Sequence, residues 1–323
     1  MAEVSGSRRP RMAPASVPGA ACRINTLPRD LLLRAISHLN ARELVQTCVL
    51  SRQWRHLWRS VPRINATIDE FDDFDGIYNF YDMADRAKEC SALFKKFVNR
   101  FLMLRNPVPL DEFRLTYYNP DGSMNRSADS EEANLWIRHA LLCNARSVEV
   151  TIQYYSLLLD PAVFTSECFL TRLLLSSVLL PPGFFRQLQT GCKALERLIL
   201  RDCDIDDVEI SSETLKVLTI DDTCCITFEE QASISIPSLL YLGFFPDARI
   251  PLLKNMESLE TACVSDDTQV DDIYKSLSGV TDLDINYEER KLKMERKLRW
   301  CPKLNNLTTL TFSSGVCIHI CIH

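Results

Sequence analysis

The spacing of apolar side chains changes along the chain, and each spacing predicts a different architecture. Between Ile24 and Pro62 apolar residues recur at intervals of three and four, which is the period of short amphipathic helices. The pattern predicts three such helices. The first opens at Pro28, the second follows Asn40 and Glu43, which have the spacing of a capping box, and the third ends before the closing proline.

This helical segment carries more apolar side chains than about forty residues can bury by themselves. Its apolar surface must therefore cover either the rest of the chain or another protein, and the pattern alone leaves both readings open. As a docking module, it would present anchors from all three helices. These anchor residues are Leu27, Pro28, Leu31, Leu32, Ile36, Leu39, Val49, Leu50, Trp54, Leu57 and Trp58.

Two segments flank the helical module. Residues 1–22 are rich in Ala, Pro, Ser, Gly and Arg and have few large apolar side chains, which predicts a disordered tail. Residues 67–105 begin as an acidic connector and end in an amphipathic helix from Cys90 to Arg105. The acidic stretch does not fit a calcium loop, because Phe71 and Asp82 stand where an acid and a glutamate are required.

From residue 106 onward, one phrase recurs: apolar, two residues, apolar, one residue, apolar. From Ala145 the copies start 20 to 27 residues apart, which suits leucine-rich repeats. The nine copies are Leu110-Phe113-Leu115, Ala145-Val148-Val150, Leu170-Leu173-Leu175, Leu195-Leu198-Leu200, Leu215-Leu218-Ile220, Leu239-Leu242-Phe244, Leu259-Ala262-Val264, Val280-Leu283-Ile285 and Leu307-Leu310-Phe312. Uneven repeat lengths predict an irregular, weakly curved solenoid, with a helix at Glu131–Leu142 inserted between the first two strands.

Side chains alternate across a strand, so the residues between the inward leucines should form the opposite, exposed face. That face is predicted to run from basic through aromatic to acidic, which would suit a partner of opposite polarity. Ordinary surface variation along a solenoid is the competing interpretation. The residues predicted to bind a partner on this face are Arg172, Arg197, Arg201, Tyr241, Phe245, Asp282 and Asp284.

Composition and charge argue against nucleic-acid binding and membrane association. A formal net charge of −6 and a pI near 5.5 provide no basic field for nucleic acid. No apolar stretch reaches the roughly 20 residues that span a bilayer, so no membrane association is expected. Thirteen cysteines without a signal peptide are expected to be reduced thiols in the cytoplasm, the nucleus or both, and Cys203 and Cys224 fall where leucine-rich repeats favour Asn or Cys.

The sequence shows no constellation for catalysis, so no catalytic residue and no cofactor are expected. Cysteine pairs with two intervening residues, the usual zinc knuckles, do not occur. Four alternating cysteines and histidines at 317–323 would lie about 6.6 Å apart on a strand, which is awkward for tetrahedral metal binding. Neighbouring aspartates such as Asp206 and Asp207 are expected in solvated turns. We therefore expect no metal site and no enzymatic activity.

The segment from Ile24 to Pro62 resembles an F-box, and its run VLSRQWRHLWRSVP resembles the plant type. Leu27 and Pro28 occupy the opening Leu-Pro of that motif. The repeats that follow make nearly the whole chain similar to plant F-box/LRR proteins, including the FKKFV helix and a Trp-Ile segment at Trp136. The resemblance implies an α+β fold, with an N-terminal helical F-box at 23–66 followed by an irregular leucine-rich repeat solenoid of α/β repeats at 106–323.

The resemblance also implies a function without bond chemistry. The F-box would bind a Skp-type adaptor, and through it the cullin and RING subunits of an SCF ubiquitin ligase, while the repeats would bind an unknown protein substrate. Such a complex accelerates ubiquitin transfer by proximity. Many relatives end in an additional C-terminal domain, which we expect to be either naturally absent or lost in a truncated isoform. The alternative function is a repeat scaffold or binding protein without a ligase role.

Overall fold

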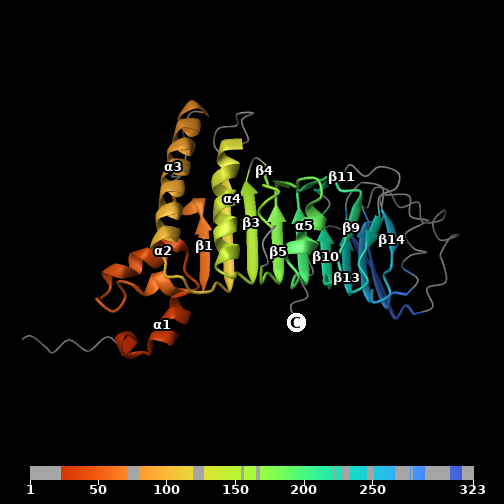
Figure 1. Cartoon of the computed structure of the whole chain (residues 1–323), viewed down its shortest axis with the longest axis horizontal. Helices are drawn as coiled ribbons and strands as arrows, with labels where there is room; N and C mark the ends of the chain where they lie inside the picture. Colours follow the sequence, from red (N-terminus) through yellow and green to blue (C-terminus); the bar gives the residue numbers. More distant parts are fainter. Residues whose placement is uncertain are drawn as a thin grey trace, which may run out of the picture.

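The computed structural model describes residues 23–71, 80–118, 127–153, 156–164, 168–221, 223–226, 233–245, 251–265, 277, 279–287 and 306–314. A small helical unit at the N-terminus is followed by a long parallel sheet, with helices packed along it (Figure 1). The predicted tail at 1–22, residues 72–79 of the acidic connector and the cysteine–histidine run at 317–323 lie outside the described residues.

The helical unit contains two of the three predicted helices. They are α1 (Arg29–Ile36) and α2 (Ala41–Gln46), and short 3-10 turns occur at η1 (Arg23–Thr26), η2 (Thr47–Val49) and η3 (Leu57–Ser60). The predicted third helix is wrong, because residues 52–56 form turns and only η3 is helical. Helix propensity alone determines local structure only weakly, because tertiary contacts can override it. Here the turns place Trp54 and Trp58 in the core.

The predicted capping box at the start of α2 is confirmed. The backbone N–H of Asn40 donates to Glu43 Oε2 at 3.0 Å, while the Asn40 side chain caps the first turn of the helix. Asn65 adds a tertiary contact, because its amide donates to Asn40 Oδ1 at 2.5 Å. The cap of α2 is therefore tied to the first strand of the sheet.

Among the described residues, the main sheet has ten strands, and every neighbouring pair is parallel. Its strands follow chain order: β1 (Arg63–Thr67), β2 (Glu112–Tyr118), β3 (Ser147–Gln153), β5 (Arg172–Ser176), β7 (Arg197–Arg201), β10 (Val217–Ile220), β13 (Tyr241–Phe244), β15 (Thr261–Ser265), β16 (Asp282–Tyr287) and β17 (Thr309–Ser314). Because each strand of this sheet pairs with the next one along the chain, successive chain segments pack side by side.

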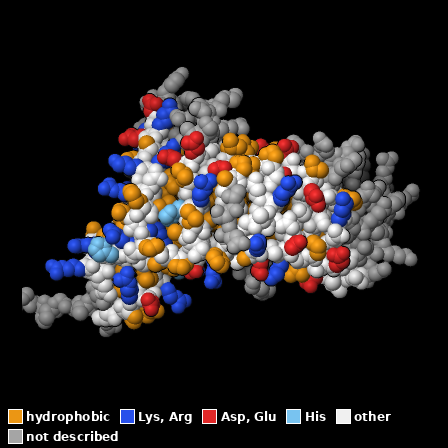
Figure 2. Space-filling model, viewed as in Figure 1, with side chains coloured by type: hydrophobic (Ala, Val, Ile, Leu, Met, Phe, Trp, Pro, Cys, Tyr) orange, Lys and Arg blue, Asp and Glu red, His pale blue; other side chains and the backbone are white. Residues whose placement is uncertain are grey.

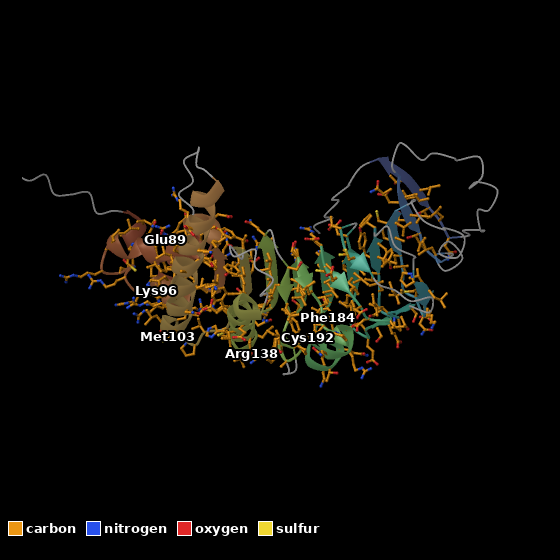
Figure 3. All side chains as sticks on the ribbon, turned by 90° about the horizontal axis from the view of Figure 1, so that it is seen from above. Glu89, Lys96, Met103, Arg138, Phe184 and Cys192 are labelled. Atoms are coloured by element: carbon orange, nitrogen blue, oxygen red, sulfur yellow. The ribbon has the colours of Figure 1, made fainter. Side chains whose placement is uncertain are left out.

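In the part of the chain that the structure describes, seven short strands form two smaller parallel sheets. One contains β4 (Leu157–Leu158), β6 (Val178–Leu179), β8 (Asp204–Ile205) and β11 (Cys225–Ile226), and the other contains β9 (Glu209–Ser211), β12 (Ser233–Ser235) and β14 (Leu252–Lys254). The helices of this part are η4 (Ile68–Phe71), α3 (Phe80–Leu104), α4 (Ser127–Leu142) and α5 (Phe184–Gly191). Seen from above, α4 and α5 lie on the same side of the main sheet (Figure 3).

The repeated apolar phrase marks the buried positions of the strands, as predicted. All three side chains of each of the first eight phrases are buried, and their middle residues align across the sheet, with Leu173 opposite Leu198 and Leu198 opposite Leu218. In the ninth phrase, Leu310 on β17 is half exposed. The register therefore follows from the sequence for most of the sheet.

Sequence reasoning missed the first strand. Val61, Ile64 and Ala66 have the spacing of the repeated phrase and all are buried, but they fall at the end of the helical module. Ile64 pairs in register with Phe113, so β1 is the edge strand of the main sheet. The boundary predicted between residues 66 and 67 falls inside this strand.

The helical unit and the sheet share one core. Trp58 packs on Phe101 of α3 with ring centroids 5.1 Å apart, and Phe94 stacks on Tyr117 of β2 at 5.7 Å. Trp136 of α4 meets Phe94 edge-on, and its Nε1–H donates to Asn99. The amphipathic helix predicted at 90–105 is therefore confirmed as part of a longer α3, which joins the N-terminal unit to the repeats.

Two predictions about single residues have different outcomes. Cys203 and Cys224 are buried, and their thiols donate to the carbonyls of Leu175 and Leu200 on preceding strands, which gives them the structural role expected. Asp207 is not a solvated turn residue. Its carboxylate accepts the backbone N–H groups of Gly183 (2.5 Å) and Phe185 (3.1 Å) at the start of α5, so it caps that helix from a distant loop.

No helix in the described parts of the chain combines the length and apolar character needed to cross a membrane.

Candidate functional site

Five large apolar side chains of the helical unit are exposed, although most of its other apolar groups are buried. Their exposed fractions are 41% for Ile24, 37% for Leu27, 48% for Leu31, 87% for Val49 and 64% for Leu50. Ile24 lies in η1, Leu31 in α1 and Val49 in η2. Leu27 and Leu50 directly follow η1 and η2, and Pro28 next to Leu27 is exposed as well. We call Ile24, Leu27, Pro28, Leu31, Val49 and Leu50 the N-terminal apolar surface. Exposed apolar side chains that gather on one short segment of the chain make that segment a candidate protein-binding site.

The predicted anchor set divides into two groups in the structure. Leu27, Pro28, Leu31, Val49 and Leu50 are exposed, whereas Leu39 is partly buried against the core. The remaining five are buried in the chain's own core: Leu32, Ile36, Trp54, Leu57 and Trp58. Their side chains are inaccessible to a partner in this arrangement, so their role is to hold the exposed group in place. The helical unit is thus both a cap on the sheet and a carrier of exposed apolar residues.

Basic residues surround the N-terminal apolar surface. The segment 24–65 contains seven arginines but only two acids, Asp30 and Glu43, in a chain with a net charge of −6. Lys and Arg side chains gather at the end of the molecule that carries the helical unit and α3 (Figure 2). A partner of this region is therefore expected to be acidic, because complementary charge steers association and suppresses wrong partners.

The face of the main sheet opposite the buried leucines is a second candidate site, which we call the open face. The register places Arg172, Arg197, Tyr241 and Asp282 in one row across β5, β7, β13 and β16, separated only by Val217 and Thr261. All four are partly exposed. The structure therefore brings these predicted residues onto one surface, in the predicted order of basic, aromatic and acidic.

The two arginines in this row face each other directly on neighbouring strands. Strands lie about 4.8 Å apart, and like charges placed directly opposite each other destabilise a sheet. Neither Arg172 nor Arg197 has an ion pair among the described residues, whereas Arg201 lies 3.8 Å from Asp221. An anionic group bound over the pair would relieve their repulsion.

Tyr241 and Phe245 project from the open face on either side of Gly243. A β-carbon built on Gly243 would lie 3.2 Å from Phe245 Cε2 and 3.3 Å from Tyr241 Cε1, so the two rings converge over the glycine. The same β-carbon would lie 3.2 Å from Thr219 Cγ2 on the next strand. The missing side chain therefore lets the rings form a shared aromatic surface near the middle of the sheet.

The acidic end of the open face lies on β16. Asp282 and Asp284 both alternate with buried residues of that strand and are partly exposed. Hydrogen bonds from Thr309 and then Thr281 lower the pKa of Asp282, so the carboxylate remains charged at neutral pH. This end would favour a basic group on a partner.

The described residues were also compared with the expectations for metal sites and cysteines. They contain no cluster of three or more His, Cys, Asp or Glu side chains that could hold a metal ion. One thiol pair was not predicted: Cys168 and Cys192, which precede the neighbouring strands β5 and β7, have their sulfurs 2.8 Å apart. Its hydrogen bond lowers the pKa of Cys168 to about 7 and raises the pKa of Cys192.

Comparison with known proteins shows which sequences this chain resembles. The family model described as "F-box domain" matches residues 24–65, which cover the helical unit and most of β1. An F-box/LRR-repeat protein of Arabidopsis thaliana is 27% identical over 68% of this chain and 49% of its own length. A putative F-box/LRR-repeat protein of the same plant is 27% identical over 90% of this chain and 76% of its own length.

A third relative, also an Arabidopsis F-box/LRR-repeat protein, is 29% identical over 68% of this chain and 72% of its own length. The chain thus spans about half the length of the first relative and about three quarters of the second and third. The N-terminal apolar surface lies within the matched F-box, and the open face lies in the part that follows it. The chain carries an F-box domain and is similar, over most of its length, to plant F-box/LRR-repeat proteins.

Proposed function

We propose that this protein is the substrate-recognition subunit of an SCF-type ubiquitin ligase. Its F-box binds a Skp-type adaptor, which connects it to the cullin and RING subunits, and its parallel sheet is a leucine-rich repeat solenoid that binds a protein substrate. The observation that carries this proposal is the exposure of Leu31, Val49 and Leu50 on a segment that matches the F-box model. Several such side chains on one short segment supply apolar area that a partner can cover.

The adaptor interface is centred on the N-terminal apolar surface. Val49 and Leu50 are the most exposed of its aliphatic side chains, so they have the most area to lose to a partner. The surrounding arginines supply a basic rim, which suits an acidic adaptor surface. Large apolar anchors at the centre and charges at the rim are the usual arrangement of a specific interface.

The substrate interface is the open face. Arg172 and Arg197 would bind an acidic group, Tyr241 and Phe245 an apolar or aromatic side chain, and Asp282 with Asp284 a basic group. A substrate segment lying across the strands would then carry these three kinds of side chain in that order. Binding alone is sufficient for function, because the complex acts by holding a substrate lysine near a charged conjugating enzyme.

The test is reconstitution of the complex from purified components. The full chain is mixed with a Skp-type adaptor and a cullin–RING complex, and assembly is followed by size-exclusion chromatography. Leu31→Asp and Val49→Asp should each abolish adaptor capture. Leu135→Asp is the matched control, because Leu135 is similarly exposed (59%) on α4, away from the F-box. If the wild-type chain captures no adaptor, the proposal fails and the protein is a repeat scaffold without a ligase role.

A further inference from the structure

A hollow of about 560 Å³ lies between the helical unit and α3, and it belongs to neither of the two surfaces described above. Its walls come from α2, η3 and η4 on one side and from three turns of α3 on the other. The residues that line it are Arg42, Val45, Trp58, Phe71, Leu93, Lys96, Phe97, Arg100, Phe101 and Leu104. We call it the junction groove.

Four aromatic rings form a continuous wall of the junction groove. Phe71 lies 5.3 Å from Phe97, Phe97 lies 5.8 Å from Phe101, and Phe101 lies 5.1 Å from Trp58, measured between ring centroids. Trp58 and Phe101 are buried, and the other two rings are partly exposed, so the wall is rigid at its base and accessible above. Rigid aromatic pockets of this kind dominate the energetics of protein interfaces.

The edges of the groove are aliphatic along α3. Leu93 is 50% exposed and Leu104 is 41% exposed, at opposite ends of the groove. The helix rises about 1.5 Å per residue, so this edge is roughly 16 Å long. That length matches about three turns of a docked helix.

The charged residues at the groove all have the same sign. Lys96 and Arg100 are one turn apart on α3, both exposed, and neither forms an ion pair in the part of the chain that the structure describes. Figure 3 shows Lys96 at the end of the molecule that carries the helical unit. The third cation, Arg42, is held over the ring of Phe71 at 4.8 Å and donates to the backbone carbonyl of Glu70. No acidic side chain is among the described residues that line the groove.

We propose that the junction groove binds an acidic amphipathic helix of a protein partner. Apolar side chains on one face of that helix would fill the space above the four rings, and its carboxylates would pair with Lys96 and Arg100. Charge complementarity selects this occupant, because a basic segment would be repelled and a wholly apolar one would leave both cations without partners. This site would give the protein a contact at the junction of F-box and repeats, in addition to the adaptor and substrate interfaces.

The test uses two synthetic fourteen-residue helical peptides as fluorescent probes for the full-length chain. Both have leucines at positions i, i+3, i+4 and i+7, and they differ only in carrying glutamates or lysines on the flanks of that face. Fluorescence anisotropy should show the glutamate peptide binding at least tenfold more tightly than the lysine peptide at low salt. The difference should shrink as salt is raised, because exposed ion pairs are screened. Equal affinity of the two peptides overturns the proposal.

Substitutions then locate the binding site. Lys96→Glu combined with Arg100→Glu should reverse the preference between the peptides, and Leu93→Asp should weaken both. Met103→Asp and Arg186→Glu are the matched controls, because both residues are exposed and neither lines the groove. All substituted residues are exposed, so the variants should remain folded, which circular dichroism verifies. An unchanged preference in the double charge reversal would place the peptide elsewhere and overturn the proposal.

Adaptor capture is measured on the same variants. In our proposal it depends on Leu31, Val49 and the arginines of the F-box, and Lys96 and Arg100 lie on α3 outside that segment. The double charge reversal should therefore leave adaptor capture intact. Peptide binding can therefore fail while adaptor capture persists, and the two proposals are tested separately. Loss of adaptor capture in the charge-reversed variant would show that the adaptor itself covers the groove, which contradicts a separate partner site.

Discussion

Truncating Val49 and Leu50 to alanine should separate adaptor binding from folding. Burying a whole valine or leucine side chain is worth about 1.5 to 3 kcal/mol. Val49 is 87% exposed and Leu50 is 64% exposed in the free chain, so most of that gain is still available to a partner. Alanine retains the β-carbon, and we therefore expect the pair to lose about 2 kcal/mol of binding free energy, which raises Kd about thirtyfold.

Trp54→Ala is the informative contrast. Its side chain is only 3% exposed and lies in the core that joins the helical unit to the sheet. Truncating a buried tryptophan typically costs about 3 to 5 kcal/mol of folding stability. The tryptophan variant should therefore unfold at a lower urea concentration, whereas the Val49/Leu50 variant should unfold at nearly the wild-type concentration.

The assay is calorimetric titration of each purified variant with a Skp-type adaptor, beside urea unfolding followed by circular dichroism. The reasoning is refuted if the Val49/Leu50 variant binds the adaptor within twofold of wild type. It is also refuted if that variant loses as much stability as Trp54→Ala, because these side chains would then be part of the core.

Three further predictions concern other parts of the molecule. Tyr241→Ala with Phe245→Ala should abolish substrate recruitment but preserve adaptor capture and the melting temperature; a variant that unfolds would show that the rings belong to the core. Asp207→Ala should cost about 1 kcal/mol in urea unfolding, because α5 loses its cap, and an unchanged midpoint would contradict that role. Iodoacetamide should label Cys168 half-maximally near pH 7, since the Cys192 thiol stabilises its thiolate, and Cys192→Ala should raise that pH; equal labelling of both thiols would contradict the assignment.

The sequence by itself determined the order of the architecture and most of the strand register. Apolar spacing changes from the helical period to the repeated strand phrase, and each phrase fixes which residues of its strand face the core. A slip of one residue would turn every leucine outward, so the pattern permits only one register. The same alternation is sufficient to place Arg172, Arg197, Tyr241 and Asp282 on one face of the sheet. The motif also located the F-box that the family model matches.

Only the tertiary structure decided which apolar residues of the F-box remain available to a partner. Leu31 and Leu32 are neighbours with equal hydrophobicity, but the first is 48% exposed and the second is fully buried. Whether each leucine is buried depends on which side of α1 packs against the core. The spacing of apolar residues predicts an apolar face on a helix, but it does not predict which element covers that face.

Contacts between residues far apart in sequence were also beyond the reach of local patterns. Asp207 caps a helix that begins more than twenty residues earlier, and Cys168 meets Cys192 because the chain segments that lead into β5 and β7 lie side by side. The junction groove likewise exists because α3 packs beside the helical unit while leaving space between them. The local sequence pattern predicts that a side chain is buried. The residue that it contacts depends on how the whole chain packs.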